Sequence, residues 1–155
     1  MSGPIEIVRA TVAERDLVLT LVDRLLHELE DHPEEFAEID RDRVLRHLER
    51  AGERWNAFLA RTPDGTTVGV ATVMETFAVY AGGDYGVIDE MYVSPAHRSR
   101  GVGRRIIEAI KEHGRGRGWL RIDVTAPPEK RWERSVRFYE TQGFVFTGPK
   151  FRFRL

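Results

Sequence analysis

The 155-residue sequence contains no cysteine. Disulfide bonds, thiolate metal sites and a cysteine nucleophile are therefore excluded, and the composition fits a cytoplasmic protein. Long apolar runs are also absent. None approaches the roughly 20 residues of a membrane-spanning helix, so we expect no membrane association. Because residues 1–4 lead directly into an expected strand over 5–10, we also expect no signal peptide.

The chain also has no large excess of either charge. Its 24 basic and 25 acidic side chains give a formal net charge of -1. A near-neutral chain argues against general binding of nucleic acid. The charges are unevenly distributed, however. Basic residues gather between Arg98 and Arg137, and acidic residues gather in the first third: Glu28, Glu30, Asp31, Glu34, Glu35, Glu38 and Asp40. This pattern indicates either solvated surface, or an anionic cofactor held by the second half and a cationic substrate met by the first.

Hydrophobic periodicity and turn residues divide the chain into expected strands and helices. At 155 residues the chain is long enough for one sizeable core, and its 41% hydrophobic content is that of a globular protein. We therefore predict a single α/β domain over 1–155. The expected strands are 5–10, 55–61, 68–80, 87–93, 119–124, 144–147 and 151–155, the last two forming an antiparallel pair. Four helices are expected. The first follows the Thr11-x-x-Glu14 capping box, and the second covers 41–51. The third runs from the 98–103 loop to about His113, and the last is closed by Gly143.

The segment from Val87 to Ile107 changes from a strand pattern to a helix pattern. The junction reads Arg98-Ser99-Arg100-Gly101-Val102-Gly103. Glycines at such a junction let backbone N–H groups approach a ligand closely, and the following helix N-terminus adds partial positive charge. The sequence therefore predicts a phosphate-binding loop here.

Two common phosphate-binding motifs do not match this loop. A Walker loop ends in Gly-Lys-Ser/Thr, and the sequence has no such run. A dinucleotide-binding fingerprint needs a third glycine, whereas Arg104, Arg105 and Ile106 follow Gly103. The prediction depends instead on Arg98 three residues before Gly101, the strand in front and the amphipathic helix behind. Elsewhere, the spacing of His27, His32 and His47 suits no metal site, and we expect no metal.

Three motifs resemble the GNAT superfamily of N-acetyltransferases. Arg98-x-x-Gly101-x-Gly103, following Met91-Tyr92-Val93-Ser94-Pro95, resembles the family's coenzyme A pyrophosphate loop. Residues 7–11 are similar to its first strand, and residues 137–144 to its last helix and following strand. The resemblance covers nearly the whole chain in the family's order. It implies a mixed central sheet of about six to seven strands, with splayed fourth and fifth strands, flanked by about four helices.

The resemblance implies acetyl-CoA as donor and coenzyme A as product. The pantetheine arm would enter between the strands at 87–93 and 119–124 and bond the backbone of Met91 and Val93. The loop amides would take the pyrophosphate, with charge-assisted contacts from arginine. The implied cofactor-binding residues are Met91, Tyr92, Val93, Arg98, Ser99, Arg100, Gly101, Val102, Gly103, Arg104 and Tyr139.

Acetyl transfer requires that an amine lose a proton and that the departing thiolate be stabilised or protonated. The resemblance implies Tyr139 as the acid for the thiolate. For the base it implies a carboxylate on the 87–93 strand, where Asp89 and Glu90 are neighbours. Strand alternation directs them to opposite faces, with Asp89 on the face of Met91, so Asp89 is preferred and Glu90 is the alternative. Burial would raise the pKa of either carboxyl towards the working range.

One position departs from the family's pattern. Where members often have an asparagine that touches the cofactor arm, this chain has Trp132, preceded by Pro127-Pro128. A wider or rotated cleft is compatible with this change.

The predicted function is direct acetyl transfer to a primary amine of a small molecule or a peptide. A cationic small amine is favoured, because residues 88–93 somewhat resemble the corresponding strand of diamine and aminoglycoside acetyltransferases and the first third is acidic. Amino acids and peptide N-termini remain open. One alternative is a catalytically inactive GNAT-fold domain that binds acyl-CoA for regulation. Another is a nucleic-acid module, whose binding would depend steeply on salt. Family members often form homodimers, although no feature of this sequence requires one.

Overall fold

The computed structural model describes residues 3–29, 39–126 and 133–155. The chain divides into two compact units, one ending at Asp123 and one starting at Val124, and each is described by itself. The strands are β1 Glu6–Arg9, β2 Trp55–Arg61, β3 Thr67–Ala78, β4 Gly83–Val93 and β5 Ile122–Val124. The helices are α1 Arg15–Glu28, α2 Arg41–Ala51, α3 Val102–Arg117 and α4 Glu133–Thr141. In these three ranges, no helix combines the length and apolar character needed to cross a bilayer.

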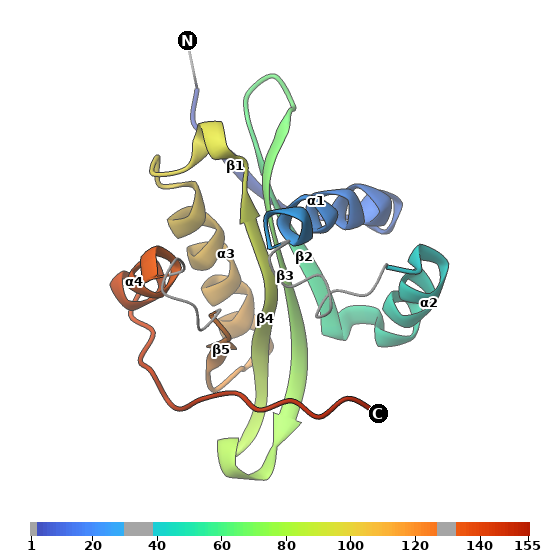
Figure 1. Cartoon of the computed structure of the whole chain (residues 1–155), viewed down its shortest axis with the longest axis vertical. Helices are drawn as coiled ribbons and strands as arrows, with labels where there is room; N and C mark the ends of the chain where they lie inside the picture. Colours follow the sequence, from blue (N-terminus) through green and yellow to red (C-terminus); the bar gives the residue numbers. More distant parts are fainter. Residues whose placement is uncertain (1–2, 30–38, 127–132) are drawn as a thin grey trace. The chain divides into compact units, whose positions relative to one another are not determined.

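The strands form one sheet in the order β1-β2-β3-β4-β5 (Figure 1). The first three neighbouring pairs are antiparallel. The chain entering β5 bonds the start of β4, where Leu120 N–H donates to the Asp84 carbonyl at 3.0 Å and Gly86 N–H donates to the Arg121 carbonyl at 3.1 Å. Residue numbers rise together along the two bonded segments, so β5 runs parallel to β4. The sheet therefore contains antiparallel and parallel pairs and is mixed, as predicted. The described residues contain five strands, fewer than the six to seven expected.

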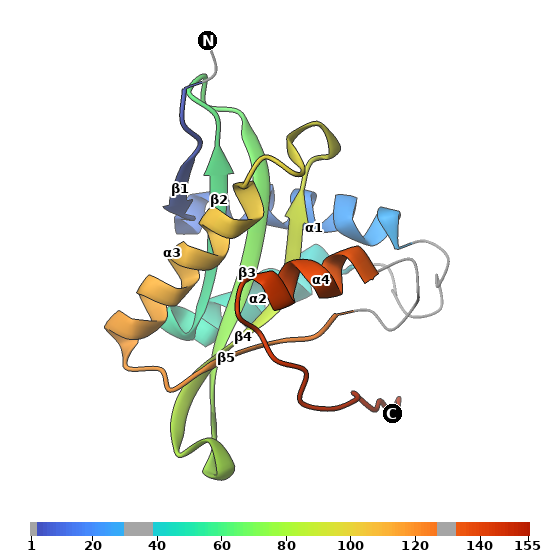
Figure 2. The same cartoon turned by 90° about the vertical axis from the view of Figure 1, so that its left-hand side faces the viewer.

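Helices α1 and α3 cover opposite faces of the sheet (Figures 1 and 2). On the α1 face, the helix buries Val18, Leu21 and Val22 against four residues of the sheet: Ala57, Leu59, Val70 and Tyr92. On the other face, α3 buries Ile106, Ile107 and Ile110. Phe58, whose neighbours in β2 face α1, contacts the His113 ring of α3 at a centroid distance of 5.5 Å. Apolar alternation in β2 therefore supplies both layers of the core.

Local signals set several element boundaries. The predicted capping box forms, with Thr11 N–H donating to Glu14 Oε2 at 2.9 Å just before α1. Asp40 accepts from the Arg43 N–H at 3.0 Å and starts α2, and Gly52 at φ 56° follows its end. The prediction that α3 ends near His113 is wrong. The helix continues to Arg117, because Gly114 is accommodated in its interior against Trp119, and Gly118 at φ 77° ends it.

The predicted antiparallel pair at 144–147 and 151–155 is also wrong. Both segments are described, and neither forms a strand. Their apolar side chains are exposed, with Phe146 81% and Phe153 88% accessible. Alternating apolar residues suit a pleated surface, but a strand also needs a neighbouring backbone with which to form its ladder. The sequence pattern identified strand propensity here without identifying a partner.

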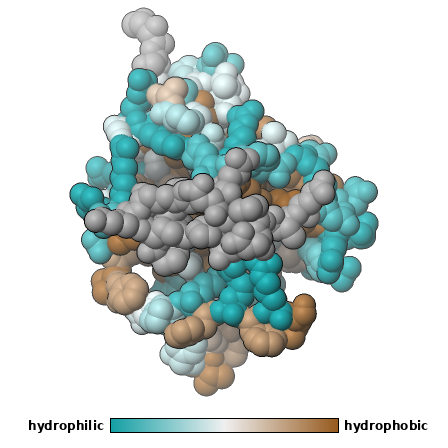
Figure 3. Space-filling model, viewed as in Figure 1, coloured by the Kyte–Doolittle hydropathy of each residue, from teal (hydrophilic) through white to brown (hydrophobic). Residues whose placement is uncertain are grey.

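Apolar side chains are also exposed at the tip of the β3–β4 hairpin, the lowest part of the view in Figure 1 and brown in Figure 3. Phe77, Val79 and Tyr80 lie there, each at least 60% accessible. The chain turns at Val79–Ala81 and Gly82, so β4 starts at Gly83, earlier than the predicted Val87. The Tyr80 ring stacks on the Arg121 guanidinium, 4.6 Å from its centroid, which holds the tip to the chain entering β5.

Candidate functional site

The predicted phosphate-binding loop joins β4 to α3 through one short turn. A 3-10 turn over Pro95–His97 leads to extended Arg98, and two left-handed residues follow, Ser99 at φ 60° and Gly101 at φ 77°. The first helical bond of α3 runs from the Arg105 N–H to the Gly101 carbonyl at 3.1 Å. The N–H groups of residues 102–104 therefore precede the helical ladder, at the positive end of the helix dipole. This is an anion-binding arrangement.

Two further basic side chains belong to this loop and the first turn of the helix. Arg100 and Arg104 are both exposed, whereas Val102 is buried beneath them. The left-handed backbone at Gly101 leaves open space at the position that a Cβ atom would occupy, with no heavy atom within 4 Å. The donor set of backbone N–H groups and guanidiniums fits a diphosphate.

The second half of β4 presents its backbone on the side away from β3. Ser94 N–H donates to the Val68 carbonyl at 2.8 Å and therefore points towards β3. By strand alternation, the peptide groups of Met91 and Val93 point to the opposite side. The bonds to the chain entering β5 lie at Asp84 and Gly86, near the other end of β4. The use of Met91 and Val93 as backbone partners for an extended ligand stays a prediction.

A β-bulge in β4 changes the interpretation of the two candidate bases. The register passes from Thr72 opposite Glu90 to Val73 opposite Ile88, so Asp89 is the additional residue. The simple alternation that placed Asp89 on the face of Met91 is therefore interrupted, and that premise was wrong. Asp89 is exposed.

Glu90 lies on the face of β4 that is packed under α1. It is one alternation from Tyr92, which belongs to the α1 core cluster. Its carboxylate accepts a hydrogen bond from the buried Thr72 hydroxyl, and its N–H donates to the same hydroxyl oxygen at 3.2 Å. Burial raises the pKa of Glu90, nearby Asp89 raises it further, and the Thr72 hydrogen bond opposes both effects. The carboxyl therefore keeps its proton to a higher pH than an ordinary glutamate.

The side chain of Arg98 faces α1 and the end of β4. Its Nε donates to the Val93 carbonyl at 2.7 Å, and its Nη2 donates to both carboxylate oxygens of Glu28, each at 2.7 Å. The guanidinium also lies 5.6 Å from the Tyr92 ring centroid. Sequence reasoning assigned Arg98 to phosphate and counted Glu28 only among the acidic residues of the first third. No local signal relates the two, because 70 positions separate them.

Tyr139, the predicted acid, lies on α4 in the C-terminal unit. Its ring contacts Phe138 and Phe144 at centroid distances of 5.3 and 5.7 Å. Burial raises the pKa of Tyr139 to about 12. The hydroxyl is therefore protonated at every pH at which the protein would work. Trp132 and Pro127-Pro128, the predicted departure from the family pattern, lie outside the described residues.

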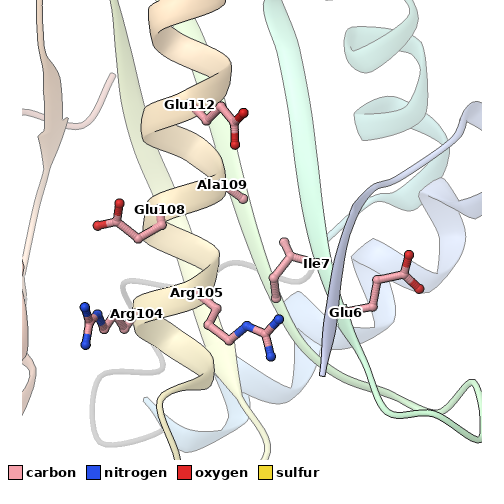
Figure 4. Close-up of a pocket in the computed structure, with 7 residues that line it drawn as sticks. All are labelled: Glu6, Ile7, Arg104, Arg105, Glu108, Ala109 and Glu112. Carbon is pink, nitrogen blue, oxygen red and sulfur yellow. The ribbon is translucent and has the colours of Figure 1, made fainter. Parts of the chain in front are cut away.

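A shallow pocket lies elsewhere, between β1 and the outer side of α3 (Figure 4). Arg105 and Ile7 point towards one another across it, whereas Arg104 and Glu108 extend on the other side of the helix. Of its lining residues, only Arg104 belongs to the predicted site. The pocket is lined by neither candidate base nor Tyr139, so it is not the place of the expected proton transfer.

Comparison with known proteins gives one family. The sequence profile of the acetyltransferase (GNAT) family matches residues 22–144. The IAA acetyltransferase of Azospirillum brasilense is 26% identical over 141 residues, which cover 90% of this chain and 86% of that protein. Glucosamine 6-phosphate N-acetyltransferase 1 of Oryza sativa subsp. japonica is 32% identical over 75 residues, covering 48% of this chain and 42% of that protein.

Solved structures show the same fold. An aminoglycoside acetyltransferase from an uncultured soil metagenomic sample superposes with a TM-score of 0.80 at 23% identity, covering 99% of each chain. Aminoglycoside N-acetyltransferase AAC(6')-Iy in complex with CoA superposes with a TM-score of 0.78 at 19% identity, covering 100% of this chain and 96% of that one.

Proposed function

Because the chain belongs to the acetyltransferase (GNAT) family, we propose that this N-acetyltransferase moves an acetyl group from acetyl-CoA directly to a primary amine of a small molecule or peptide. The loop from Arg98 to Gly103 at the start of α3 is the observation that carries the proposal. Its left-handed backbone and the positive helix end suit a pyrophosphate. The family uses acetyl-CoA, and the structure of one neighbour contains CoA.

The residues present fit coenzyme A as a ligand. Backbone N–H groups from Ser99 to Arg104 would hold the pyrophosphate, with the exposed Arg100 and Arg104 guanidiniums beside them. The outward N–H and C=O of Met91 and the outward N–H of Val93 would bond the pantetheine arm as a neighbouring strand would, while Arg98 holds the Val93 carbonyl. When bound, acetyl-CoA supplies an acetyl group activated as a thioester.

The chain itself would supply proton transfer at both ends of the reaction. Glu90, or alternatively Asp89, accepts the proton that leaves the amine nitrogen. Glu90 is oriented by Thr72, and burial raises its pKa, which brings its basicity closer to the working pH. Tyr139 holds its proton and donates it, or a hydrogen bond, at the departing sulfur. No covalent enzyme intermediate is required.

The acceptor that we favour is a cationic small amine. Both solved structures described above are aminoglycoside acetyltransferases, which supports this class by analogy of fold. A panel of diamines, aminoglycosides, amino acids and peptide N-termini, assayed by thiol release, tests the proposal. Tight CoA binding without turnover of any amine would favour the inactive regulatory domain instead.

The substitution Gly101→Glu should abolish binding of acetyl-CoA. A carboxylate in the open space at Gly101 would repel the pyrophosphate and obstruct the loop. At a ligand concentration about 100 times Kd, the wild-type melting temperature should rise by about 5 to 10 °C, and this rise should vanish in the variant. The measurement is a thermal shift with acetyl-CoA and CoA.

Gly65→Glu is the matched control for this experiment. Gly65 also has a left-handed backbone, at φ 85°, with nothing within 4 Å of a Cβ atom, but it lies in the turn before β3. Both variants acquire similar backbone strain and one negative charge. The control should keep the full ligand-induced shift. An undiminished shift in Gly101→Glu would contradict the assignment of the loop.

The substitution Glu90→Gln should lower kcat about 10²-fold and remove the acidic limb of its pH profile. A base works only when deprotonated, so wild-type kcat should fall as pH drops through the raised pKa of Glu90. Glutamine cannot titrate, and the ratio of wild-type to variant kcat should therefore rise with pH. Asp89→Asn is the comparison. If it alone removes the limb, Asp89 is the base, and if neither variant does, both assignments are wrong.

A further inference from the structure

The partnership of Glu28 with Arg98 has an electrostatic cause. Glu28 is the last residue of α1, where the carbonyl ends of the helix carry partial negative charge. A carboxylate is unfavourable at that position unless a cation lies beside it. The Arg98 guanidinium supplies the cation, contacting both carboxylate oxygens. With side chains 40% and 32% accessible, the pair itself adds little to stability. What the pair does show is the direction in which the Arg98 side chain extends, towards the end of α1.

Arg98 connects this helix end to the start of the phosphate-binding loop. Its side chain holds the Val93 carbonyl, at the last residue of β4, and its own backbone leads into left-handed Ser99. A left-handed backbone at a residue other than glycine persists only when its surroundings fix it. Further bonds at the same turn join Ser94 Oγ to His97 Nδ1 at 2.9 Å and the Arg98 N–H to the Pro95 carbonyl at 3.3 Å.

We propose that Arg98 is a positioning residue. Held by Glu28, it fixes the Val93 carbonyl and the start of the loop, so that the loop N–H groups meet the cofactor pyrophosphate already arranged. Glu28 thereby contributes to donor binding without touching the donor. This inference rests on the proposed function, because it assigns how the same site is organised.

The alternative role for Arg98, direct contact with phosphate, predicts the opposite effect of removing Glu28. If the guanidinium bound phosphate, Glu28 would compete with the phosphate for it. Glu28→Ala would then leave the affinity for acetyl-CoA unchanged or increase it. If Arg98 positions the loop, the same variant frees the guanidinium from α1 and weakens binding. The sign of the change therefore separates the two roles.

The experiment is calorimetric titration of acetyl-CoA into the full chain. Glu28→Ala should weaken the Kd about fivefold to tenfold. Glu49→Ala, which removes an exposed acid from α2, should change it by less than about twofold. Both variants lose one negative charge, which by itself favours a polyanionic ligand. If Glu28→Ala weakens binding and Glu49→Ala does not, the weaker binding is therefore not caused by the long-range effect of the lost charge.

Steady-state kinetics supply a readout that altered stability alone would not produce. In Glu28→Ala, the KM for acetyl-CoA should rise while kcat at saturating donor stays within about twofold. Arg98→Lys should weaken binding similarly, because one ammonium cannot reproduce the fork that joins Val93 to Glu28. Glu28→Gln keeps the side-chain shape if the alanine variant folds poorly. Unchanged or tighter binding in the Glu28 variants overturns the positioning role, whereas a wild-type protein that binds no acetyl-CoA overturns the proposed function.

Discussion

Replacing Tyr139 by phenylalanine should lower kcat about 10²-fold and leave the KM for acetyl-CoA nearly unchanged. The substitution removes only the hydroxyl, while the ring keeps its contacts with Phe138 and Phe144. Burial holds the pKa of Tyr139 at about 12, so the wild-type hydroxyl is a proton donor throughout the neutral range. Without it, the thiolate would leave unassisted. The measurement is thiol release at saturating acetyl-CoA and amine.

Tyr80→Phe is the matched control for Tyr139→Phe. Tyr80 lies at the exposed tip of the β3–β4 hairpin, where its hydroxyl accepts a hydrogen bond from Arg121 Nη2 at 2.7 Å. The same chemical change there should alter kcat by less than about twofold. Thermal unfolding of both variants checks that each is folded. If Tyr139→Phe keeps wild-type kcat, the acid role is wrong and another group must assist the departing sulfur.

Elements with signals at both ends were predictable from the sequence. The helix at 41–51 has the bounds expected for it, because Asp40 caps its first turn and Gly52 follows its last residue. The strand at 55–61 also matches, since apolar residues crowd it and Pro63-Asp64-Gly65 forms the turn after it. These signals are local, and local interactions decide where such elements begin and end.

Features that depend on pairing between distant segments were not predictable. The bulge at Asp89 depends on the register of β4 against β3, which strand alternation along one segment does not reveal. The Arg98–Glu28 contact joins residues 70 positions apart. Conversely, residues 144–147 and 151–155 have a strand pattern without a ladder partner. In the candidate site, the sequence identified the loop and the acids, but the arrangement of side chains around them came from tertiary contacts.

The indole of Trp119 shows how closely such contacts constrain the sheet. Its Nε1 donates to Glu75 Oε2 at 2.6 Å, and its ring lies edge-on to His113 at a centroid distance of 5.3 Å. Glu75 is buried, with 6% of its surface exposed, and Arg117 donates to both of its carboxylate oxygens at 2.7 Å. The Arg117 hydrogen bonds lower the pKa of Glu75 to about 2, with Trp119 adding to the effect against burial. This carboxylate therefore stabilises the fold above about pH 4.5, and the contribution is lost as pH falls from there towards 2.

Gly86→Ala should destabilise the protein by about 3 kcal/mol and lower its melting temperature by roughly 10 °C. A Cβ atom at Gly86 would lie 2.3 Å from Trp119 Cζ3, well inside van der Waals contact. The ring cannot retreat towards Gly114, where it already fills the space of a side chain, at 2.6 Å from the Cβ position. Any displacement would weaken its hydrogen bond to the buried Glu75, which adds to the cost of overpacking.

Gly116→Ala is the control for Gly86→Ala, because it makes the same chemical change with the opposite expected sign. Gly116 lies within α3, and a Cβ atom there meets nothing within 4 Å, so alanine should stabilise the helix by about 0.5–1 kcal/mol.

Urea denaturation at neutral pH measures both changes, and repeating it near pH 3 tests the Glu75 contribution. If Trp119 is displaced in Gly86→Ala, that variant should lose less stability on acidification than the wild type, since its Glu75 pKa would lie nearer the ordinary value. A melting temperature within about 2 °C of wild type would show that the indole moves freely, contrary to the packing described.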